Sequence, residues 1–218
     1  MRSAQPEDRP GVWGDLRAGV KYVVHTRWLL WTLIFGSSLA LIVQGPIEVL
    51  LPFLTRERFD DAEATFGFLL AAYGIGGAIG SLTVSSLKLP RRYLTFMILC
   101  WGGGTLPLVL IGAATNLIVM LAALFIVGAT TGAGVVIWGT LLQRLVPLEM
   151  IGRVASLDFF VSIAFMPVSI AIAGPLSLLV PIPTIFMIAG IIPPVLAVVA
   201  LWAGRMREVE RTHHLDAH

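Results

Sequence analysis

Charged residues are scarce in this sequence, and long stretches of it contain none. Asp, Glu, Lys and Arg make up 13% of the 218 residues, whereas an ordinary soluble domain has roughly 25%. The long uncharged runs are Trp28–Ile47, Ala64–Leu87, Tyr93–Gln143 and Phe159–Gly204. A soluble domain cannot accommodate such runs, because some face of every element must meet water. The shortage of charge therefore excludes a soluble fold and indicates a membrane protein.

Cysteine and histidine are also poorly placed for catalysis. The one cysteine, Cys100, excludes an intramolecular disulfide and a multi-cysteine metal site. The four histidines lie outside the uncharged runs, so no Ser–His pair for intramembrane proteolysis can form; they are His25, His213, His214 and His218. Neither an H-E-x-x-H zinc motif nor a Walker A loop occurs. These absences argue against an enzyme, and the sequence predicts no cofactor, no metal site and no nucleic-acid partner.

The apolar sequence that remains is long enough for six membrane crossings. A helix needs ~20 apolar residues to span ~30 Å of hydrocarbon. The run at 93–143 holds two crossings with a turn at Thr115-Asn116, and Pro181-Ile182-Pro183 divides 159–204 in the same way. The crossing at 28–54 is interrupted at Gln44-Gly45-Pro46 and closed by Pro52, and another crossing covers 64–87. We predict an all-α membrane protein with six transmembrane helices.

Three regions follow from this pattern. They are a cytoplasmic N-terminal segment (1–27), a six-helix transmembrane domain (28–204) and a cytoplasmic tail (205–218). In the first region Trp13, Leu16, Val20 and Val23 recur at helical spacing. This spacing predicts a short amphipathic helix in the membrane interface, with a flexible tail as the alternative. The segment lacks the apolar core of a cleavable signal peptide.

The basic residues orient the crossings. With the N-terminus in the cytoplasm, thirteen Lys and Arg residues fall inside and two, Arg56 and Arg58, fall outside. Cytoplasmic segments of membrane proteins carry such an excess of Lys and Arg. The sequence therefore predicts a multi-pass protein of the plasma (bacterial inner) membrane, with both termini cytoplasmic.

Ionisable residues within the hydrocarbon are costly, which makes them candidates for function. Glu48 lies inside the first crossing, beside Gln44 and the Gly45-Pro46 break. It is a candidate for proton exchange, and the alternative is an interfacial Glu that reaches the outer surface. Tyr73 and Trp138 join Gln44 and Glu48 as candidates for lining a substrate or proton pathway, although aromatic residues in a bundle also serve as packing or interface anchors.

A second group of charges is expected at the cytoplasmic face. Asp158, which with Glu48 is one of the two ionisable candidates within the crossings, opens the predicted fifth crossing, five residues after Arg153. The alternative is a structural role at the helix start, where the helix dipole stabilises a carboxylate and a cytoplasmic Arg can pair with it. The candidates for a cytoplasmic gating loop are Lys88, Arg91, Arg92, Glu149, Arg153 and Asp158.

Small residues recur at four-residue spacing in two of the crossings. They are Ala72, Gly76 and Gly80 in one, and Gly128 and Gly132 in another. Small residues in this register let helices approach closely in lipid. The pattern predicts close helix contacts, either within the chain or with a partner.

Four stretches carry a resemblance to a transporter family. They are 14–22 (GDLRAGVKY), 66–77 (FGFLLAAYGIGG), 147–154 (PLEMIGRV) and Gly174-Pro175. In this order they resemble the linker into a second half, an eighth helix, the loop between a tenth and an eleventh helix, and the echo of an antiporter glycine-proline motif. Over residues 14–205 the chain is similar to the C-terminal six-helix half of a major facilitator superfamily transporter. The resemblance is to the drug-efflux branch that includes macrolide and enterobactin exporters.

The resemblance implies a function and a missing partner. It implies efflux of small amphiphilic compounds or drugs, with proton antiport as one mode of coupling, through a site between two halves. The family has twelve crossings and this chain has six, so a homodimer or a separate N-terminal six-helix half is expected. The basic loop Lys88–Arg92 also lacks the acidic residue of the family's gating motif. The alternatives are a non-transporting membrane assembly subunit and a truncated fragment without a function of its own.

Overall fold

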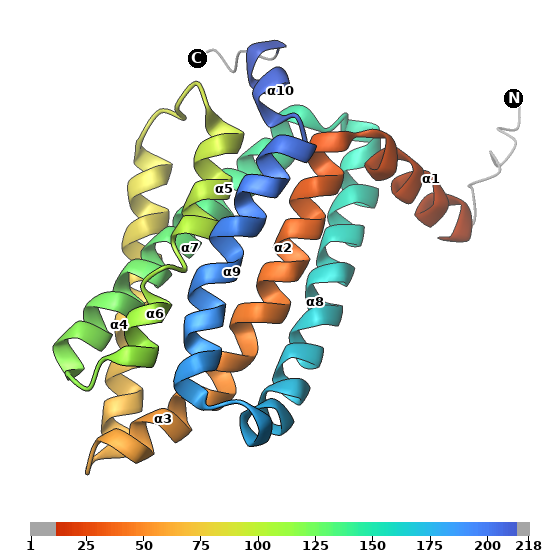
Figure 1. Ribbon diagram of the computed structural model, residues 1–218. Helices are drawn as coiled ribbons and strands as arrows, with labels where there is room; N and C mark the ends of the chain where they lie inside the picture. Colours follow the sequence, from red (N-terminus) through yellow and green to blue (C-terminus); the bar gives the residue numbers. More distant parts are fainter. Residues whose placement is uncertain (1–11, 213–218) are drawn as a thin grey trace, which may run out of the picture.

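The computed structural model describes residues 12–212 (Figure 1). Residues 1–11 of the predicted N-terminal segment and 213–218 of the predicted tail, with His213, His214 and His218, lie outside the described residues. Within the described range the regular structure is helical. The elements are α1 (Val12–His25), α2 (Arg27–Gly45), a π-helical segment η1 (Pro46–Leu50), α3 (Leu51–Arg58), α4 (Ala62–Ser86), α5 (Tyr93–Gly103), α6 (Leu108–Ala113), α7 (Leu117–Leu145), α8 (Leu148–Leu179), α9 (Ile182–Ala203) and α10 (Met206–Thr212).

Six helical stretches in the described range are long and apolar enough to cross a membrane. They are Arg27–Arg58, Ala62–Ser86, Tyr93–Ala113, Leu117–Leu145, Leu148–Leu179 and Ile182–Ala203. The prediction of an all-α fold with six candidate crossings is therefore confirmed. The turn predicted at Thr115-Asn116 separates α6 from α7, and the Asn116 side chain accepts hydrogen bonds from the N–H groups of Ile118 and Val119 at the start of α7.

The interruption predicted at Gln44-Gly45-Pro46 is a change from α-helix to the π-helical η1, whereas Pro52 does not close the first crossing as predicted. At Gly45-Pro46 the helix continues as η1, and Pro52 stands in the first turn of α3, where a missing N–H costs little. The Ser169 hydroxyl from α8 accepts from the Gly45 N–H at 2.8 Å and donates to the Leu41 carbonyl at 2.6 Å. A side chain thus supplies the hydrogen bonds that the altered backbone needs.

The fifth crossing also begins earlier than predicted. The stretch 147–154, which resembles a loop between two helices in the sequence, is mostly helical, since α7 runs to Leu145 and α8 starts at Leu148. At 32 residues, α8 is about 48 Å long, which exceeds the ~30 Å hydrocarbon. Asp158 therefore does not open this helix but lies ten residues inside it.

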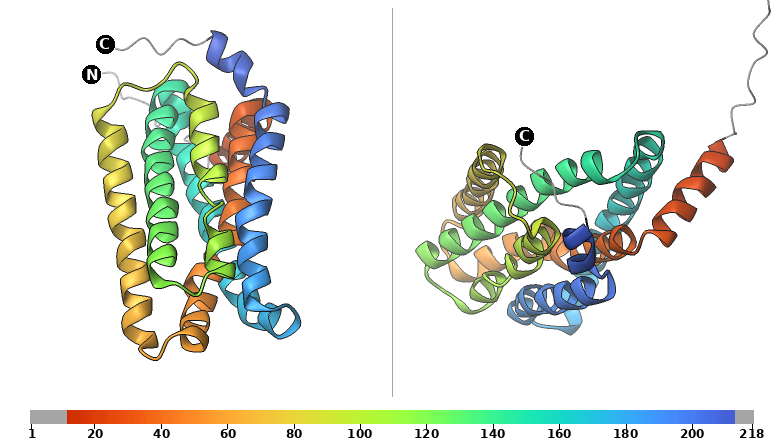
Figure 2. Two further views of the ribbon diagram at one scale, coloured as in Figure 1. Left: turned by 60° about the vertical axis from the view of Figure 1, so that its left-hand side comes forward. Right: turned by 90° about the horizontal axis from the view of Figure 1, so that it is seen from above.

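The helices pack as two pairs with further helices between them (Figure 2). In one pair α4 lies along α7, and in the other α2 lies along α8. Helices α5, α6 and α9 connect the pairs, because α9 packs on α2, α5 and α6, while α5 and α6 also pack on α7. The core has two clusters along the bundle. One contains Trp28, Tyr93 and Trp138, and the other contains Leu50, Leu108 and Phe186 near α3.

Glycines bring α4 and α7 into direct backbone contact. A Cβ atom on Gly76 would lie 2.1 Å from the Phe125 carbonyl oxygen, and one on Gly80 would lie 2.0 Å from that of Ala129. Reciprocally, a Cβ atom on Gly128 would lie 2.0 Å from the Tyr73 oxygen. Gly132 makes the same kind of approach to Gly77, and Ala72 lies half-buried on α4. These contacts are within the chain, so this spacing does not require a partner.

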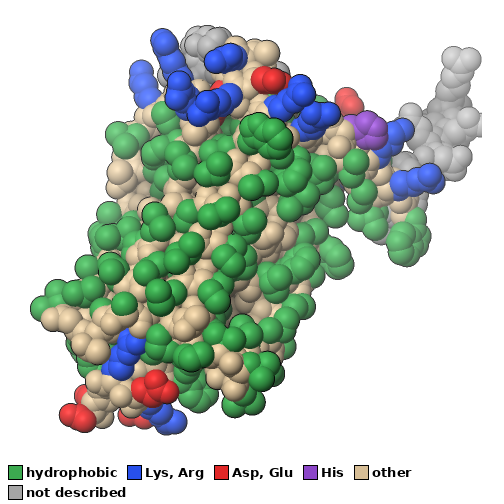
Figure 3. Space-filling model, viewed as in Figure 1, with side chains coloured by type: hydrophobic (Ala, Val, Ile, Leu, Met, Phe, Trp, Pro, Cys, Tyr) green, Lys and Arg blue, Asp and Glu red, His purple; other side chains and the backbone are tan. Residues whose placement is uncertain are grey.

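The two ends of the bundle differ in charge (Figure 3). Lys and Arg side chains gather at the end where α10 lies, which we call the α10 end; the described ones are Arg17, Lys21, Arg27, Lys88, Arg91, Arg92, Arg144, Arg153, Arg205, Arg207 and Arg211. The opposite end, the α3 end, carries Arg56 and Arg58 with Glu57, Asp60, Asp61 and Glu63. The Arg58 guanidinium donates to the carbonyls of Ile111, Gly112 and Ala114, so it caps the end of α6.

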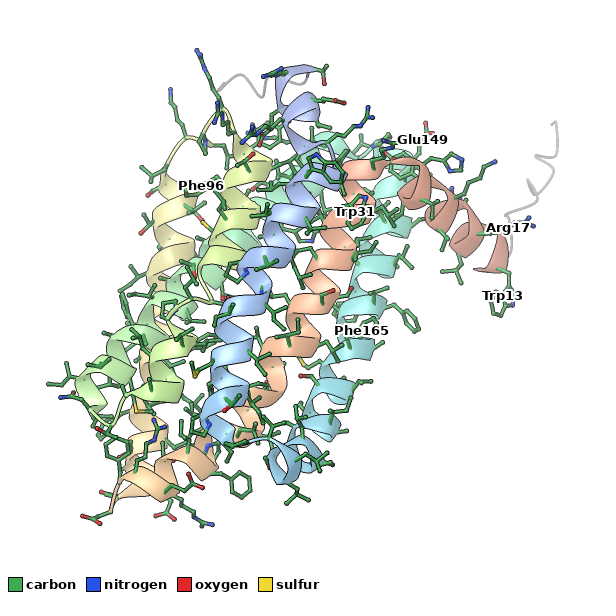
Figure 4. All side chains as sticks on the ribbon, in the orientation of Figure 1. Trp13, Arg17, Trp31, Phe96, Glu149 and Phe165 are labelled. Carbon is green, nitrogen blue, oxygen red and sulfur yellow. The ribbon has the colours of Figure 1, made fainter. Side chains whose placement is uncertain are left out.

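Helix α1 projects sideways from the α10 end (Figures 1 and 4). Trp13, Leu16 and Val20 are exposed on it, whereas Val23 is buried against the bundle. Figure 4 shows the Trp13 side chain directed downward from α1, away from the α10 end, and the Arg17 side chain directed outward. The helix predicted here is present, and its position in the membrane interface stays a prediction.

The charge difference between the ends makes orientation testable. Single cysteines replacing Asp60, Pro90 and Asn116 in a Cys100→Ser background all lie at connections between helices. Because basic segments are retained in the cytoplasm, we expect a membrane-impermeant maleimide to label positions 60 and 116 in sealed cells. Position 90 should be labelled only after the membrane is opened. Labelling of position 90 in sealed cells would show that the α10 end faces outward.

Candidate functional site

A cavity of about 360 Å³ lies between the α2–α8 pair and the α4–α7 pair. Its size is in the range of small-molecule pockets, ~300–1,000 Å³. The residues that line it come from α2, η1, α4, α5, the turn after α5, α7 and α8. They are Thr32, Leu33, Gly36, Ser37, Leu39, Ala40, Val43, Gln44, Ile47, Glu48, Leu70, Tyr73, Trp101, Thr105, Val127, Thr131, Val135, Trp138, Asp158 and Ser162. The wall is mainly apolar, with polar groups at a few points.

The four residues predicted for a substrate or proton pathway all line this cavity. Gln44 and Glu48 come from the end of α2 and from η1, Tyr73 comes from α4 and Trp138 comes from α7. Residues 44 and 48 are one turn apart in sequence, whereas Tyr73 and Trp138 come from different helices. The fold thus brings together residues that the sequence singled out separately.

The first polar group in the wall is the pair formed by Gln44 and Glu48. The Gln44 side-chain N–H donates to a carboxylate oxygen of Glu48. Glu48 lies in the π-helical segment, and short π-helical segments often occur at functional sites. The Ser169 hydroxyl braces this segment from α8 through Gly45 and Leu41. The carboxylate is therefore held on a backbone that is fixed from a second helix.

The second polar group is the pair formed by Trp138 and Asp158. The Trp138 indole N–H of α7 donates to Asp158 Oδ2 of α8 at 2.9 Å. This bond bridges the two helix pairs across the cavity. Trp28 and Trp101 pack against the Trp138 ring with centroids 6.4 Å away in each case, a separation typical of favourable aromatic pairs. Trp138 is thereby fixed in place, and its indole fixes the carboxylate.

The position of Asp158 corrects the grouping made from the sequence. It was grouped with the cytoplasmic charges, but it lines the cavity, half-buried, ten residues inside α8. The other candidates of that group do not line the cavity. Lys88, Arg91 and Arg92 lie between α4 and α5, and Glu149 and Arg153 lie near the start of α8 (Figure 4). Their role in gating stays a prediction.

Sequence reasoning missed Trp101 and Thr131, which also line the cavity. The Trp101 indole N–H donates to the Thr131 carbonyl at 3.3 Å, and Thr131 lies beside Tyr73 on the wall. Gly134 leaves room for this indole, since a Cβ there would lie 2.3 Å from Trp101 Nε1. No signal in the sequence distinguishes these residues, because both lie in a run that is apolar on every face.

The cavity is open on one side. Glu48, Leu70, Val135 and Ser162 line it and are exposed. Among the described residues, no group of three His, Cys, Asp or Glu side chains is arranged to hold a metal ion. The arrangement offers an apolar chamber with two carboxylates and hydrogen-bonding groups in its wall.

The chain is distantly similar to bacterial proteins that are named as efflux pumps or exporters. The chain is 28% identical over 195 residues to the multidrug efflux pump Tap of Mycolicibacterium fortuitum, a match that covers 88% of this chain and 46% of the pump. It is 28% identical over 153 residues to the enterobactin exporter EntS of Escherichia coli (strain SE11), covering 70% of this chain and 36% of the exporter. The same identity and coverage hold for the EntS protein of Shigella boydii serotype 18.

The chain spans less than half the length of these relatives. No family model matches the sequence, and no solved structure matches it. The chain is thus distantly similar to bacterial efflux transporters, which are not enzymes, and it has six helices suited to a membrane.

Proposed function

We propose that this chain forms one half of an efflux transporter for small amphiphilic compounds and works with a second six-helix half. The observation that carries the proposal is the open cavity between the two helix pairs, with Glu48 and Asp158 in its wall. A cavity with these groups is suited to a compound that has both apolar surface and a polar or charged group. The relatives named for multidrug and enterobactin export support the direction of transport.

The need for a second half follows from the open side of the cavity. Carboxylates such as Glu48 and Asp158 are expensive to expose to hydrocarbon, so a protein surface is expected to cover them. Helices α4 and α8 are the least buried of the six spans. In their most apolar 18-residue stretch 11% and 12% of the residues are buried, whereas 33–44% of the residues in the corresponding stretch of the other four spans are buried. These two helices belong to different pairs and offer the surface on which a second half would pack.

The covering half is either a second copy of this chain or a separate N-terminal six-helix chain. The resemblance to a half of a major facilitator superfamily transporter supports this arrangement, since such transporters expose a central site to each side in turn by moving one half against the other. The charges at the α10 end, Lys88, Arg91, Arg92, Glu149 and Arg153, are proposed to hold the two halves together on the cytoplasmic side.

Efflux in intact cells tests this function. Cells that lack the gene are expected to accumulate a fluorescent amphiphilic compound such as ethidium, and the wild-type gene should restore export. Asp158→Ala should fail to restore it, because the substitution removes both the charge and the acceptor of the Trp138 bond. Ser177→Ala is the matched control, since Ser177 lies on α8 and bonds only within its own helix, to the Gly174 carbonyl.

The export measurements distinguish transport through this cavity from a role without transport. Loss of export with Asp158→Ala but not with Ser177→Ala, at equal amounts in the membrane, supports transport through this cavity. If deletion of the gene changes the accumulation of no compound in a panel of amphiphiles, the transport proposal is wrong and a non-transporting subunit is the better account.

A further inference from the structure

A second hollow, which we call the α10 groove, lies at the α10 end and away from the transport cavity. It is bounded by α5, α9, α10 and the start of α2, and its volume is about 840 Å³. Arg27, Arg205 and Arg207 line it together with Leu99, Val198 and Trp202. The groove thus combines a cluster of cations with an apolar wall. None of these residues lines the cavity described above.

The wall formed by α10 is held firmly against the bundle. Glu210 is 5% exposed and accepts hydrogen bonds from the Thr95 N–H at 2.7 Å and from the Thr95 hydroxyl at 3.0 Å. These bonds fix α10 to the first turn of α5. Met206, at the start of α10, is completely buried. The groove is therefore a built feature of the fold and not a gap beside a loose tail.

Arg205 enters the groove from a strained backbone. Its φ of 49° is in the left-handed region, which is uncommon for residues other than glycine, Asn and Asp. Strain of this kind persists where the surrounding structure fixes it, and it clusters at functional sites. Here it turns the chain from α9 into α10, so that Arg205 and Arg207 both border the groove.

The groove carries excess positive charge. Glu208 also lines it and pairs with Arg205 at 3.6 Å, both side chains being exposed. With three arginines and one glutamate in its lining, the groove has a net charge of +2. These charges stand at the end of α9, which is a candidate membrane span, and therefore at the level where lipid headgroups meet the bilayer core.

The apolar wall continues from the arginines along the membrane span. Leu99 is 48%, Val198 is 63% and Trp202 is 83% exposed. A free anion would satisfy the arginines but would leave this wall uncovered. A phospholipid satisfies both parts, since its phosphate is anionic and its acyl chains are apolar. Tryptophan at such a boundary is a common interfacial anchor.

We propose that the α10 groove binds an anionic phospholipid, with its phosphate among Arg27, Arg205 and Arg207 and an acyl chain against Leu99, Val198 and Trp202. Basic pockets between transmembrane helices are known to recognise lipid headgroups in this way. The site belongs to the six-helix chain itself. It does not depend on a second half or on transport, so its failure would leave the proposed function untouched.

Lipid binding to the purified full chain tests the site. We would add phosphatidylglycerol or phosphatidylcholine with identical oleoyl chains in a neutral detergent and measure the bound lipid by native mass spectrometry. Phosphatidylglycerol should bind more tightly than phosphatidylcholine. Each Arg near an anionic headgroup contributes a factor of about five, so Arg205→Gln with Arg207→Gln should weaken phosphatidylglycerol binding by about 25-fold.

The controls separate this site from general attraction. Arg91→Gln with Arg92→Gln removes the same charge at the same end, outside the groove, and should leave binding unchanged. Trp202→Ala keeps every arginine and should weaken binding of both lipids, which tests the site even if the double variant does not fold. Glycerol phosphate should not displace the lipid.

Three outcomes would overturn the proposal. The first is equal binding of phosphatidylglycerol and phosphatidylcholine to the wild-type chain. The second is an equal loss in the Arg91→Gln, Arg92→Gln control, which would indicate attraction by the whole basic end. The third is displacement by glycerol phosphate with no effect of Trp202→Ala, which would indicate a site for soluble anions.

Discussion

Gly80→Ala adds only one methyl group, but it is expected to destabilise the helix bundle strongly. The new methyl group would start 2.0 Å from the Ala129 carbonyl oxygen of α7, so α4 and α7 would have to separate. Overpacking of a core costs about 1–3 kcal/mol, and a clash with backbone is expected at the upper end because backbone cannot rotate away. The measurement is the midpoint of thermal unfolding in detergent, together with the fraction of chain recovered folded from membranes.

The same helix provides the control for this prediction. Gly74 on α4 has no atom within 4 Å of the position that its Cβ would take. Gly74→Ala should be neutral or stabilise α4, since alanine is favoured over glycine in a helix by about 1 kcal/mol. The two substitutions add the same methyl group and should act in opposite directions. If Gly80→Ala is tolerated as well as Gly74→Ala, the close contact of α4 and α7 is wrong.

Glu48→Gln is expected to abolish pH-driven substrate movement while leaving the protein in the membrane. Glutamine keeps the size of the side chain and can still hydrogen-bond to Gln44, but it cannot gain or lose a proton. If Glu48 couples transport to protons, movement should fall to the level of vesicles without the protein. The measurement is movement of a fluorescent substrate under an imposed pH gradient, in everted vesicles that contain the full assembly.

Glu63→Gln is the matched control for this substitution. Glu63 is exposed at the start of α4 and does not line the cavity; its Oε1 atom lies 3.9 Å from Nη2 of Arg56. Loss of its charge should therefore not affect pH-driven movement of the substrate. Persistence of pH-driven movement at the wild-type rate in Glu48→Gln would mean that Glu48 serves as an interfacial anchor. Asp158→Asn, which removes the charge of the other carboxylate in the cavity wall, should be measured alongside it.

The overall architecture could be predicted from the sequence because hydropathy determines it. Helices that cross a membrane must satisfy their own backbone groups, so uncharged runs of sufficient length are helices. The turn at Thr115-Asn116 was visible because polar residues are rare in the run that it divides. Glycines at four-residue spacing also indicated a close helix contact, which the fold forms between α4 and α7.

The arrangement around the cavity could not be predicted in the same detail. Gly45-Pro46 was predicted to interrupt the first crossing, and the sequence could not show that the helix continues there as η1 with hydrogen bonds from Ser169, which is 124 residues from Gly45 in the chain. Asp158 was placed at a helix start because Glu149 and Arg153 look like loop charges, whereas α8 extends past them. Trp101 lies in a run without a polar face, so periodicity gave no direction to its side chain.

The central claim is that a second half covers the open side of the cavity, and cross-linking in native membranes tests it most directly. Ser162 lines the cavity and is exposed, whereas Val195 is exposed on α9 and does not line it. Ser162→Cys and Val195→Cys, each in a Cys100→Ser background, would be labelled with a benzophenone maleimide and irradiated, so that the excited ketone inserts into C–H bonds of any chain in contact, and the products would be identified by mass. The account predicts that Ser162→Cys joins this chain to a second copy or to another six-helix chain far more efficiently than Val195→Cys does. Recovery of the uncoupled chain alone from Ser162→Cys, or equal coupling at both positions, would contradict it.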